Sequence, residues 1–193
     1  FHKADQARSE GKSSNEFMEE NSIEIFINFL IDSNIKLNPK ELRITFYEWF
    51  QAIYSRDTHD LLAFHIPDTI YSSIFEIINK KKPSTFLDLN PKFGFYLYEI
   101  QHLVKEIFGY TGGSIETMPK QTNLVKNYLN SEISKHKEIY WIKQLNEHKF
   151  DMIFSSILGI NRILQNQLDD SVSDEGHLIM LGKPFMGGIN FKN

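Results

Sequence analysis

The sequence contains no cysteine among its 193 residues, which excludes disulfide bonds, thiolate nucleophiles and zinc sites built on cysteine. Long hydrophobic runs are also missing. The most apolar stretch, 23–31, is interrupted by Glu24 and Asn28, so we expect no segment that spans a bilayer. No secretory signal is recognisable, and we expect a soluble, cytoplasmic protein that makes no contact with a membrane. Because the chain begins with Phe1 and not with methionine, we expect it to be a fragment or to lack its natural start.

An excess of positive charge is absent as well. The chain has 21 basic and 25 acidic residues, a formal net charge of −4, so no strong overall field attracts nucleic acid or an anionic membrane. Any contact with nucleic acid would have to come from a local patch. The seven histidines show no spacing typical of metal ligands with an acid nearby, and surface or capping roles are the better interpretation.

Aromatic and aliphatic residues, in contrast, are plentiful. Hydrophobic residues make up 41% of the chain, with 16 Phe and 8 Tyr, which is enough for a substantial aromatic core. The length suits one α/β domain, or a small helical domain with a partial α/β core.

The N-terminal part of the chain predicts helices. Residues 1–14 are polar without an apolar period, and we expect a flexible arm there. A helical segment, 15–60, should follow. It contains amphipathic helices over 15–32 and 38–55, the second opened by Asn38 as the N-cap and Pro39 as its first residue.

From residue 61 onward the pattern predicts strands that alternate with helices. After a helix over 67–79, we expect strands at 84–89, 113–117, 138–142, 150–155 and 176–182, with helices at 95–108, 119–131 and 160–168. Such alternation indicates a mostly parallel sheet with right-handed crossovers. The expected fold class is therefore α/β, a Rossmann-like doubly wound domain of about five strands over 61–193, preceded by the N-terminal helical layer.

Ligands of such sheets bind beyond the carboxyl ends of the strands, beside the point where the strand order reverses. This rule directs attention to the loop from Asp88 to Gly94, which contains only one glycine. That is too few for a loop that cradles phosphates. Glu116 would end the second strand, where an acid commonly holds ribose hydroxyls. A solvated acid at the end of a strand is an equally good interpretation of Glu116.

Five segments, taken in order, resemble motifs of the adenine-N6 DNA methyltransferases of type I and type IIG restriction–modification systems. Together they span about 140 residues of the chain, and no single motif is intact. The segments are 46–67 (the approach to the catalytic domain), 88–97 (DLNPKFGFYL, similar to D-P-A-C-G-S-G-G-F-L), 114–129 (similar to G-x-E-x-x-P-x-x-x-x-L-A-x-x-N-L), 150–159 (FDMIFSSILG, similar to F-D-x-I-x-x-N-P-P-Y/F) and 176–184 (similar to a G-G-x-x-x-x-x-x-P strand).

This resemblance implies a class I methyltransferase fold with S-adenosylmethionine as its cofactor. It also implies a helix that begins at Pro67, lies ahead of the first strand and packs on the sheet. The residues at the family's cofactor-binding positions are His65, Pro67, Asp88, Asn90, Gly94 and Glu116. Ser156 stands at the position of the family's catalytic Asn.

The departures from the family are as informative as the matches. Lys92 replaces the first glycine of the cofactor loop, so Lys92 and Phe93 place side chains where the cofactor would lie. The two prolines and the aromatic residue that hold a flipped base are replaced by residues 157–159 (Ile-Leu-Gly). The chain also ends soon after the fifth strand, where the family adds a closing strand hairpin.

We therefore expect a degenerate DNA adenine-methyltransferase-like domain that is catalytically inactive. Its role would be structural, nucleic-acid-binding or partner-binding, with DNA or with another methyltransferase or specificity subunit. The alternatives are an active S-adenosylmethionine-dependent N6-adenine DNA methyltransferase and a methyltransferase relative that acts on RNA or protein.

Overall fold

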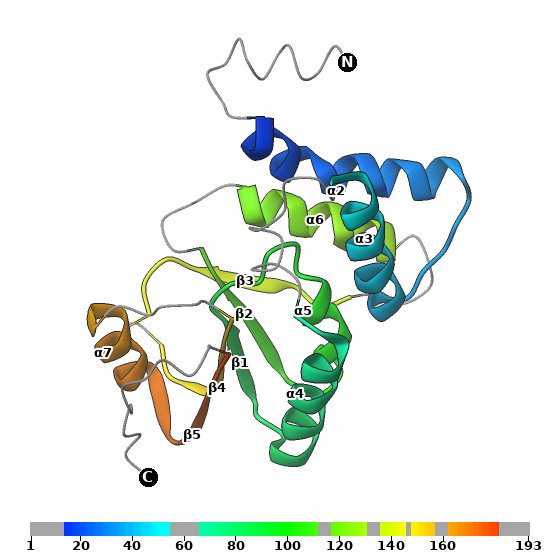
Figure 1. The fold of residues 1–193 in the computed structure, drawn as a ribbon. Coiled ribbons are helices and arrows are strands. Elements are labelled where there is room, and N and C mark those ends of the chain that lie inside the picture. The colour runs from blue at the N-terminus through cyan, green and yellow to red at the C-terminus, as the bar shows by residue number, and fades with distance from the viewer. Residues whose placement is uncertain are drawn as a thin grey trace.

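A single parallel sheet forms the centre of the molecule (Figure 1). The computed structural model describes residues 14–54, 66–111, 117–130, 136–145, 148–156 and 162–181. Its strands are β1 (Thr85–Asp88), β2 (Glu106–Tyr110), β3 (Ile139–Ile142), β4 (Phe150–Ser155) and β5 (Val172–Met180). They lie in the order β3-β2-β1-β4-β5, and every neighbouring pair is parallel. The predicted Rossmann-like fold class is therefore confirmed.

The strand order reverses between β1 and β4. The chain builds outward from β1 through β2 to β3, and then returns to place β4 on the other side of β1. Asp88 at the end of β1 is in register with Phe154 of β4. The carboxyl ends of these two strands therefore form the crevice in which such folds bind ligands.

Most helices cover one face of the sheet. α4 (Asp68–Lys81) precedes β1, and α5 (Phe95–Ile100) and α6 (Thr117–Leu129) connect the first three strands. α2 (Ser14–Asp32) packs on α6, and α3 (Pro39–Tyr54) packs on α5 (Figure 1). Residues of all five helices share one hydrophobic core with the strands, so the N-terminal helices are part of the same packed unit.

The opposite face of the sheet carries α7 (Arg162–Ser171), which lies apart from the other helices (Figure 1). Leu168 of α7 is fully buried in a second core cluster with Leu87 and Ile153. The connection from β3 to β4 also contributes to this cluster through Leu145. This connection spans only residues 143–149, although a parallel crossover usually takes a dozen or more residues.

Two predicted elements are wrong. The helix expected over 95–108 ends at Ile100, and the strand expected over 113–117 is formed instead by 106–110. Within β2, Ile107 packs against the helical layer while Phe108 packs in the second cluster, so both faces of this strand are apolar. Apolar residues on both faces remove the alternation that identifies a strand. Thr117, placed at the end of the expected strand, already belongs to α6.

The predicted starts of two helices are confirmed. Asn38 and Glu41 form a reciprocal capping box, in which each backbone N–H donates to the other side chain at 3.0 Å. Pro67 is the N-cap of α4, and its carbonyl accepts the N–H groups of Ile70 and Tyr71. Within the described part of the chain, no helix is both long and apolar enough to cross a membrane.

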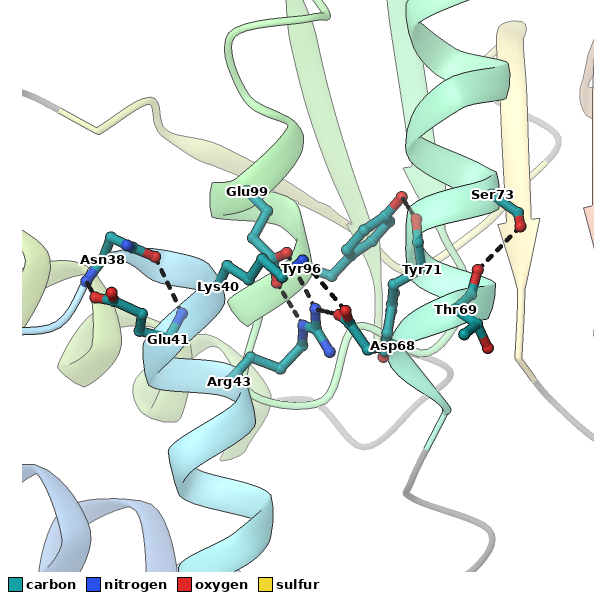
Figure 2. Close-up of polar contacts among 10 residues, drawn as sticks. All are labelled: Asn38, Lys40, Glu41, Arg43, Asp68, Thr69, Tyr71, Ser73, Tyr96 and Glu99. Carbon is teal, nitrogen blue, oxygen red and sulfur yellow. Dashed lines mark hydrogen bonds and ion pairs between the residues drawn. The ribbon is translucent and has the colours of Figure 1, made fainter.

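A buried arginine holds α3 against α4 and α5 (Figure 2). The Arg43 side chain is 3% exposed, and its Nε donates to Glu99 Oε1 at 2.5 Å. Its Nη2 donates to Asp68 Oδ1 at 2.6 Å, and the guanidinium lies 4.2 Å from the centre of the Tyr71 ring. Lys40 Nζ adds a more exposed contact, 3.1 Å from Asp68 Oδ2. α3 is thus joined to α4 and α5 by charge as well as by apolar packing.

Replacing this arginine by an unbranched apolar residue should destabilise the fold. Arg43→Met leaves the Glu99 carboxylate, 11% exposed, without its cation, and we expect a loss of about 3 kcal/mol in the free energy of unfolding. Urea denaturation at neutral pH measures it. The double variant Arg43→Met/Glu99→Met should recover most of the loss, and Lys40→Met, an exposed control, should cost less than about 1 kcal/mol. A double variant as unstable as the single one would show that charge pairing is not the cause.

Candidate functional site

The predicted site lies where β1 and β4 end. Asp88 closes β1, and Ser156 directly follows β4. Both residues line one small cavity. Asn90, in the loop that joins β1 to α5, lines the same cavity. The cavity has a volume of about 20 Å³, which is room for about one water molecule.

The loop after β1 is held by its own backbone. The Leu89 N–H donates to the Phe154 carbonyl at 2.9 Å, which ties the loop to β4. The Asn90 N–H donates to Asp88 Oδ1 at 2.8 Å, and the Gly94 N–H donates to the Pro91 carbonyl at 2.7 Å. The loop is therefore a tight turn that ends in the first residues of α5.

Two residues of this turn have left-handed backbone conformations. Gly94 has φ +76°, and Lys92, at the position of a glycine in the resembled family, has φ +50°. A side chain in this region costs about 1 kcal/mol, which is why glycine is preferred there. The loop thus retains a conformation suited to glycine at residue 92 although the sequence supplies a lysine.

Gly94 serves the packing of helices rather than access for a ligand. A Cβ atom added to Gly94 would lie 2.6 Å from Cγ2 of Thr122, a buried residue of α6. The missing side chain therefore lets α5 approach α6 closely, and this chain itself occupies the space.

Aromatic rings fill the region in front of the loop. The Phe93 ring packs edge-on against Phe46 of α3, with centroids 4.9 Å apart, and lies 5.8 Å from Phe95. Tyr47 of α3 and Tyr96 of α5 also line the cavity. Ligand pockets generally measure about 300–1,000 Å³, so the described residues leave no room for a nucleoside at this position.

The buried carboxyl group of Asp88 has an unusual electrostatic environment. Asp88 is 4% exposed, and burial raises its pKa from 3.8 to about 7, against the opposing effects of the Asn90 N–H and the Lys92 ammonium. Burial likewise raises the pKa of the neighbouring Tyr47 to about 12. Asp88 therefore changes its charge near neutral pH.

The structure brings together three of the predicted site residues. Asp88, Asn90 and Ser156 line the same cavity. Pro67 and Gly94 lie near it as the residues that begin α4 and α5, but they do not line it. His65, Glu116 and residues 157–159 lie outside the described residues, and their roles remain predictions.

The predicted place of Glu116 at the end of the second strand is wrong. β2 ends at Tyr110, six residues before Glu116. The residue directly after β2 is Thr111, which is buried. Its N–H and its hydroxyl both donate to the Ile142 carbonyl at the end of β3, at 3.1 and 3.3 Å. The end of the second strand therefore carries no acid.

Sequence reasoning missed the contribution of α3 and α4 to the site. Arg43 and Tyr47 of α3 line the cavity together with Tyr71 of α4. Arg43 was detectable in principle, because a charged residue there interrupts the apolar face formed by Leu42, Phe46 and Phe50. Its partner could not be identified in this way, because Glu99 lies 56 residues away. Among the described residues, no group of three or more His, Asp or Glu side chains could hold a metal ion.

Removing the Asp88 charge should flatten the pH dependence of stability. Because the folded pKa is raised, the unfolded chain loses its proton first, and stability falls as pH rises from about 4 to about 7. The free energy of unfolding of Asp88→Asn should match that of the wild type near pH 4. At pH 8 it should be higher by up to about 4 kcal/mol, because each pKa unit corresponds to about 1.4 kcal/mol. Urea denaturation across this range tests it, with exposed Asp169→Asn as the control. A variant less stable than the wild type at pH 8 would contradict the expectation.

Comparison with known proteins gives fold relatives only. No family model matches the sequence, and no curated protein matches it. Among solved structures, the chain is similar to a ribosomal protein L11 methylase from Lactobacillus delbrueckii subsp. bulgaricus (21% identity, 60% of this chain and 61% of that chain, TM-score 0.41). It is also similar to an SAH-bound methyltransferase from Podospora anserina (16% identity, 69% of this chain and 58% of that chain, TM-score 0.47). A third similar structure is an SAM-dependent methyltransferase from Thiobacillus denitrificans in complex with S-adenosyl-L-homocysteine (14% identity, 60% of this chain and 48% of that chain, TM-score 0.41).

The chain spans less than two thirds of the length of each of these three proteins. At 14–21% identity the similarity concerns the fold alone. The three names describe methyltransferases, and none of them points to the adenine-N6 DNA methyltransferases that the sequence motifs resemble.

Proposed function

We propose that this chain is a methyltransferase-like domain that does not methylate, because its own side chains close the cofactor pocket. The observation that carries the proposal is the loop from Asp88 to Gly94, where aromatic packing leaves a cavity of about 20 Å³ at the strand-order reversal. The resemblance to adenine-N6 DNA methyltransferases supports the proposal that the domain derives from a methyltransferase. The substitutions at 157–159 support the proposal that it no longer catalyses methyl transfer.

The residues present do not fit S-adenosylmethionine. A cofactor lying against this loop needs bare backbone, but Lys92 and Phe93, which both carry large side chains, line the cavity. The Thr122 side chain fills the space that the missing side chain of Gly94 leaves. No acid follows β2 directly to hold ribose hydroxyls, because Thr111 occupies that position. We therefore derive no methyl-transfer step for the described residues.

One observation favours the alternative of a working enzyme. Asp88, Asn90 and Ser156, all predicted from the family motifs, meet at the same cavity. An active S-adenosylmethionine-dependent enzyme, acting on DNA adenine or on RNA or protein, would have to open the loop by moving Phe93 away from Phe46. Binding of the cofactor separates the two proposals.

Titration with S-adenosylmethionine and S-adenosylhomocysteine tests the closed pocket. A site with a Kd of about 10 µM would raise the unfolding free energy by about 2.7 kcal/mol at about 1 mM ligand. For a chain of this size, that gain corresponds to a rise in Tm of about 5–11 °C. We expect a rise below about 1 °C, with a known S-adenosylmethionine-binding protein measured in parallel.

The variant Lys92→Gly/Phe93→Ala supplies the complementary measurement. Glycine suits the left-handed backbone at residue 92, and alanine removes the ring that packs on Phe46. A shift in this variant alone would show that these two side chains close the site. A shift in the wild type would contradict the proposal and favour the working enzyme.

We further propose that the domain acts through a protein partner, such as an active methyltransferase or specificity subunit, rather than through DNA. Two observations support this preference: the net charge is −4, and α2 exposes 51% of Phe29 and 57% of Ile31. Exposed apolar residues of this kind are typical of protein interfaces, whereas DNA binding depends mainly on basic groups.

An electrophoretic shift assay with duplex and single-stranded DNA tests this preference. We expect no complex even at low salt, because no excess of basic charge is available for the phosphates. A complex whose affinity falls steeply as salt rises would instead assign a nucleic-acid-binding role.

A further inference from the structure

A second and much larger hollow lies on the helical side of the molecule. It has a volume of about 690 Å³ and runs between the start of α3, one face of α4 and the region around α5. This volume is within the range of about 300–1,000 Å³ of small-molecule sites. We call it the α4–α5 groove. Arg43, Tyr71 and Tyr96 line both this groove and the closed cavity, so they form the wall between the two.

Aromatic rings line the α4–α5 groove. The Phe75 and His102 rings lie 5.8 Å apart, and the Tyr98 and His136 rings meet edge-on at 5.6 Å. Burial and the nearby Lys126 lower the pKa of His136, which favours the neutral form of this imidazole. The Phe75 and His136 rings are half-buried and the His102 ring is exposed, so the groove offers partly accessible aromatic rings. Such rings attract flat apolar groups and cations.

The charges in the groove leave one carboxylate in excess. Arg43 is neutralised by Glu99 and Asp68, and Lys40 also contacts Asp68, so these two cations and two anions balance one another. Glu76 of α4 lines the groove and is exposed, and no cation pairs with it among the described residues. An anionic ligand would find the guanidinium already engaged by carboxylates, whereas a cation would find Glu76 and the ring faces.

From this combination we propose that the α4–α5 groove is a binding site for an organic cation, an ammonium group carried on a planar apolar body. The planar body lies against the rings, and the ammonium group lies towards Glu76. This site is separate from the proposed function, because it requires neither the loop from Asp88 to Gly94 nor its opening.

Three compounds that share one ring system test the choice of ligand. Tryptamine carries an ammonium group, tryptophol is its neutral counterpart, and indole-3-propionate is an anionic one. We expect tryptamine to bind with a Kd of about 1 mM or tighter by ligand-observed NMR or calorimetry. Tryptophol should bind about threefold more weakly, the size of effect expected of one exposed ion pair, and indole-3-propionate more weakly still.

A bulky residue on α4 tests the location. Ser72 and Ser73 are exposed neighbours on this helix, but only Ser72 lines the groove. Ser72→Trp should abolish tryptamine binding, whereas the matched control Ser73→Trp should leave it unchanged. Both variants are checked for an unchanged circular dichroism spectrum and Tm.

Removal of one charge tests the proposed contact. Glu76→Gln should weaken tryptamine binding about threefold and remove its preference over tryptophol, whereas exposed Glu48→Gln, outside the groove, should change neither. The proposal is overturned if no compound binds, if the neutral or anionic compound binds as well as tryptamine, or if Ser72→Trp and Ser73→Trp behave alike. Failure here leaves the titration with S-adenosylmethionine unaffected, so the two proposals fail separately.

Discussion

The arrangement of the helical layer depends on the burial of one guanidinium group. Burial alone would lower the pKa of Arg43, but its hydrogen bonds to Glu99 and Asp68 and the charge of Glu99 hold this pKa above its ordinary value. The same contacts fix α3 relative to α4 and α5, because Arg43 belongs to α3 and its partners belong to the other two helices. An uncompensated charge at this depth would cost several kcal/mol, so the docked position of α3 is strongly favoured over any position that separates these groups.

Docking of α3 in this position determines the state of both hollows. It brings Phe46 against Phe93, which fills the region in front of the cofactor-type loop, and it brings Tyr47 into the lining of the small cavity. On the other side, the engaged Arg43 forms part of the wall of the α4–α5 groove. The wall of Arg43, Tyr71 and Tyr96 therefore separates a closed cavity at the strand ends from an open groove between the helices, and both hollows depend on the position of α3.

Local signals in the sequence were sufficient for part of this picture. Asn38 with Glu41 predicted the start of α3, Pro67 predicted the start of α4, and Asp88 was correctly placed at the end of β1. The start of β2 was missed, because its residues are apolar on both faces and no glycine or proline separates it from α5. Lys92 and Phe93 predicted that side chains would fill the cofactor position. The contribution of α3 to this filling was not predicted, because it depends on contacts between residues about 50 positions apart, such as Phe46 with Phe93.

The interactions that close the cavity are also interactions that stabilise the domain. The Phe46 ring packs against three other rings, with centroid distances of 5.3 Å to Phe26 of α2, 4.9 Å to Phe93 of the loop and 5.3 Å to Phe95 of α5. Each such pair contributes about 0.5–1.5 kcal/mol beyond the area it buries, and exposing one buried Phe costs about 1.5–3 kcal/mol. Opening the loop for a cofactor would therefore loosen the attachment of the N-terminal helices. A ligand at the strand ends would have to repay that cost before it gained any net affinity, whereas a ligand in the α4–α5 groove would not disturb these rings.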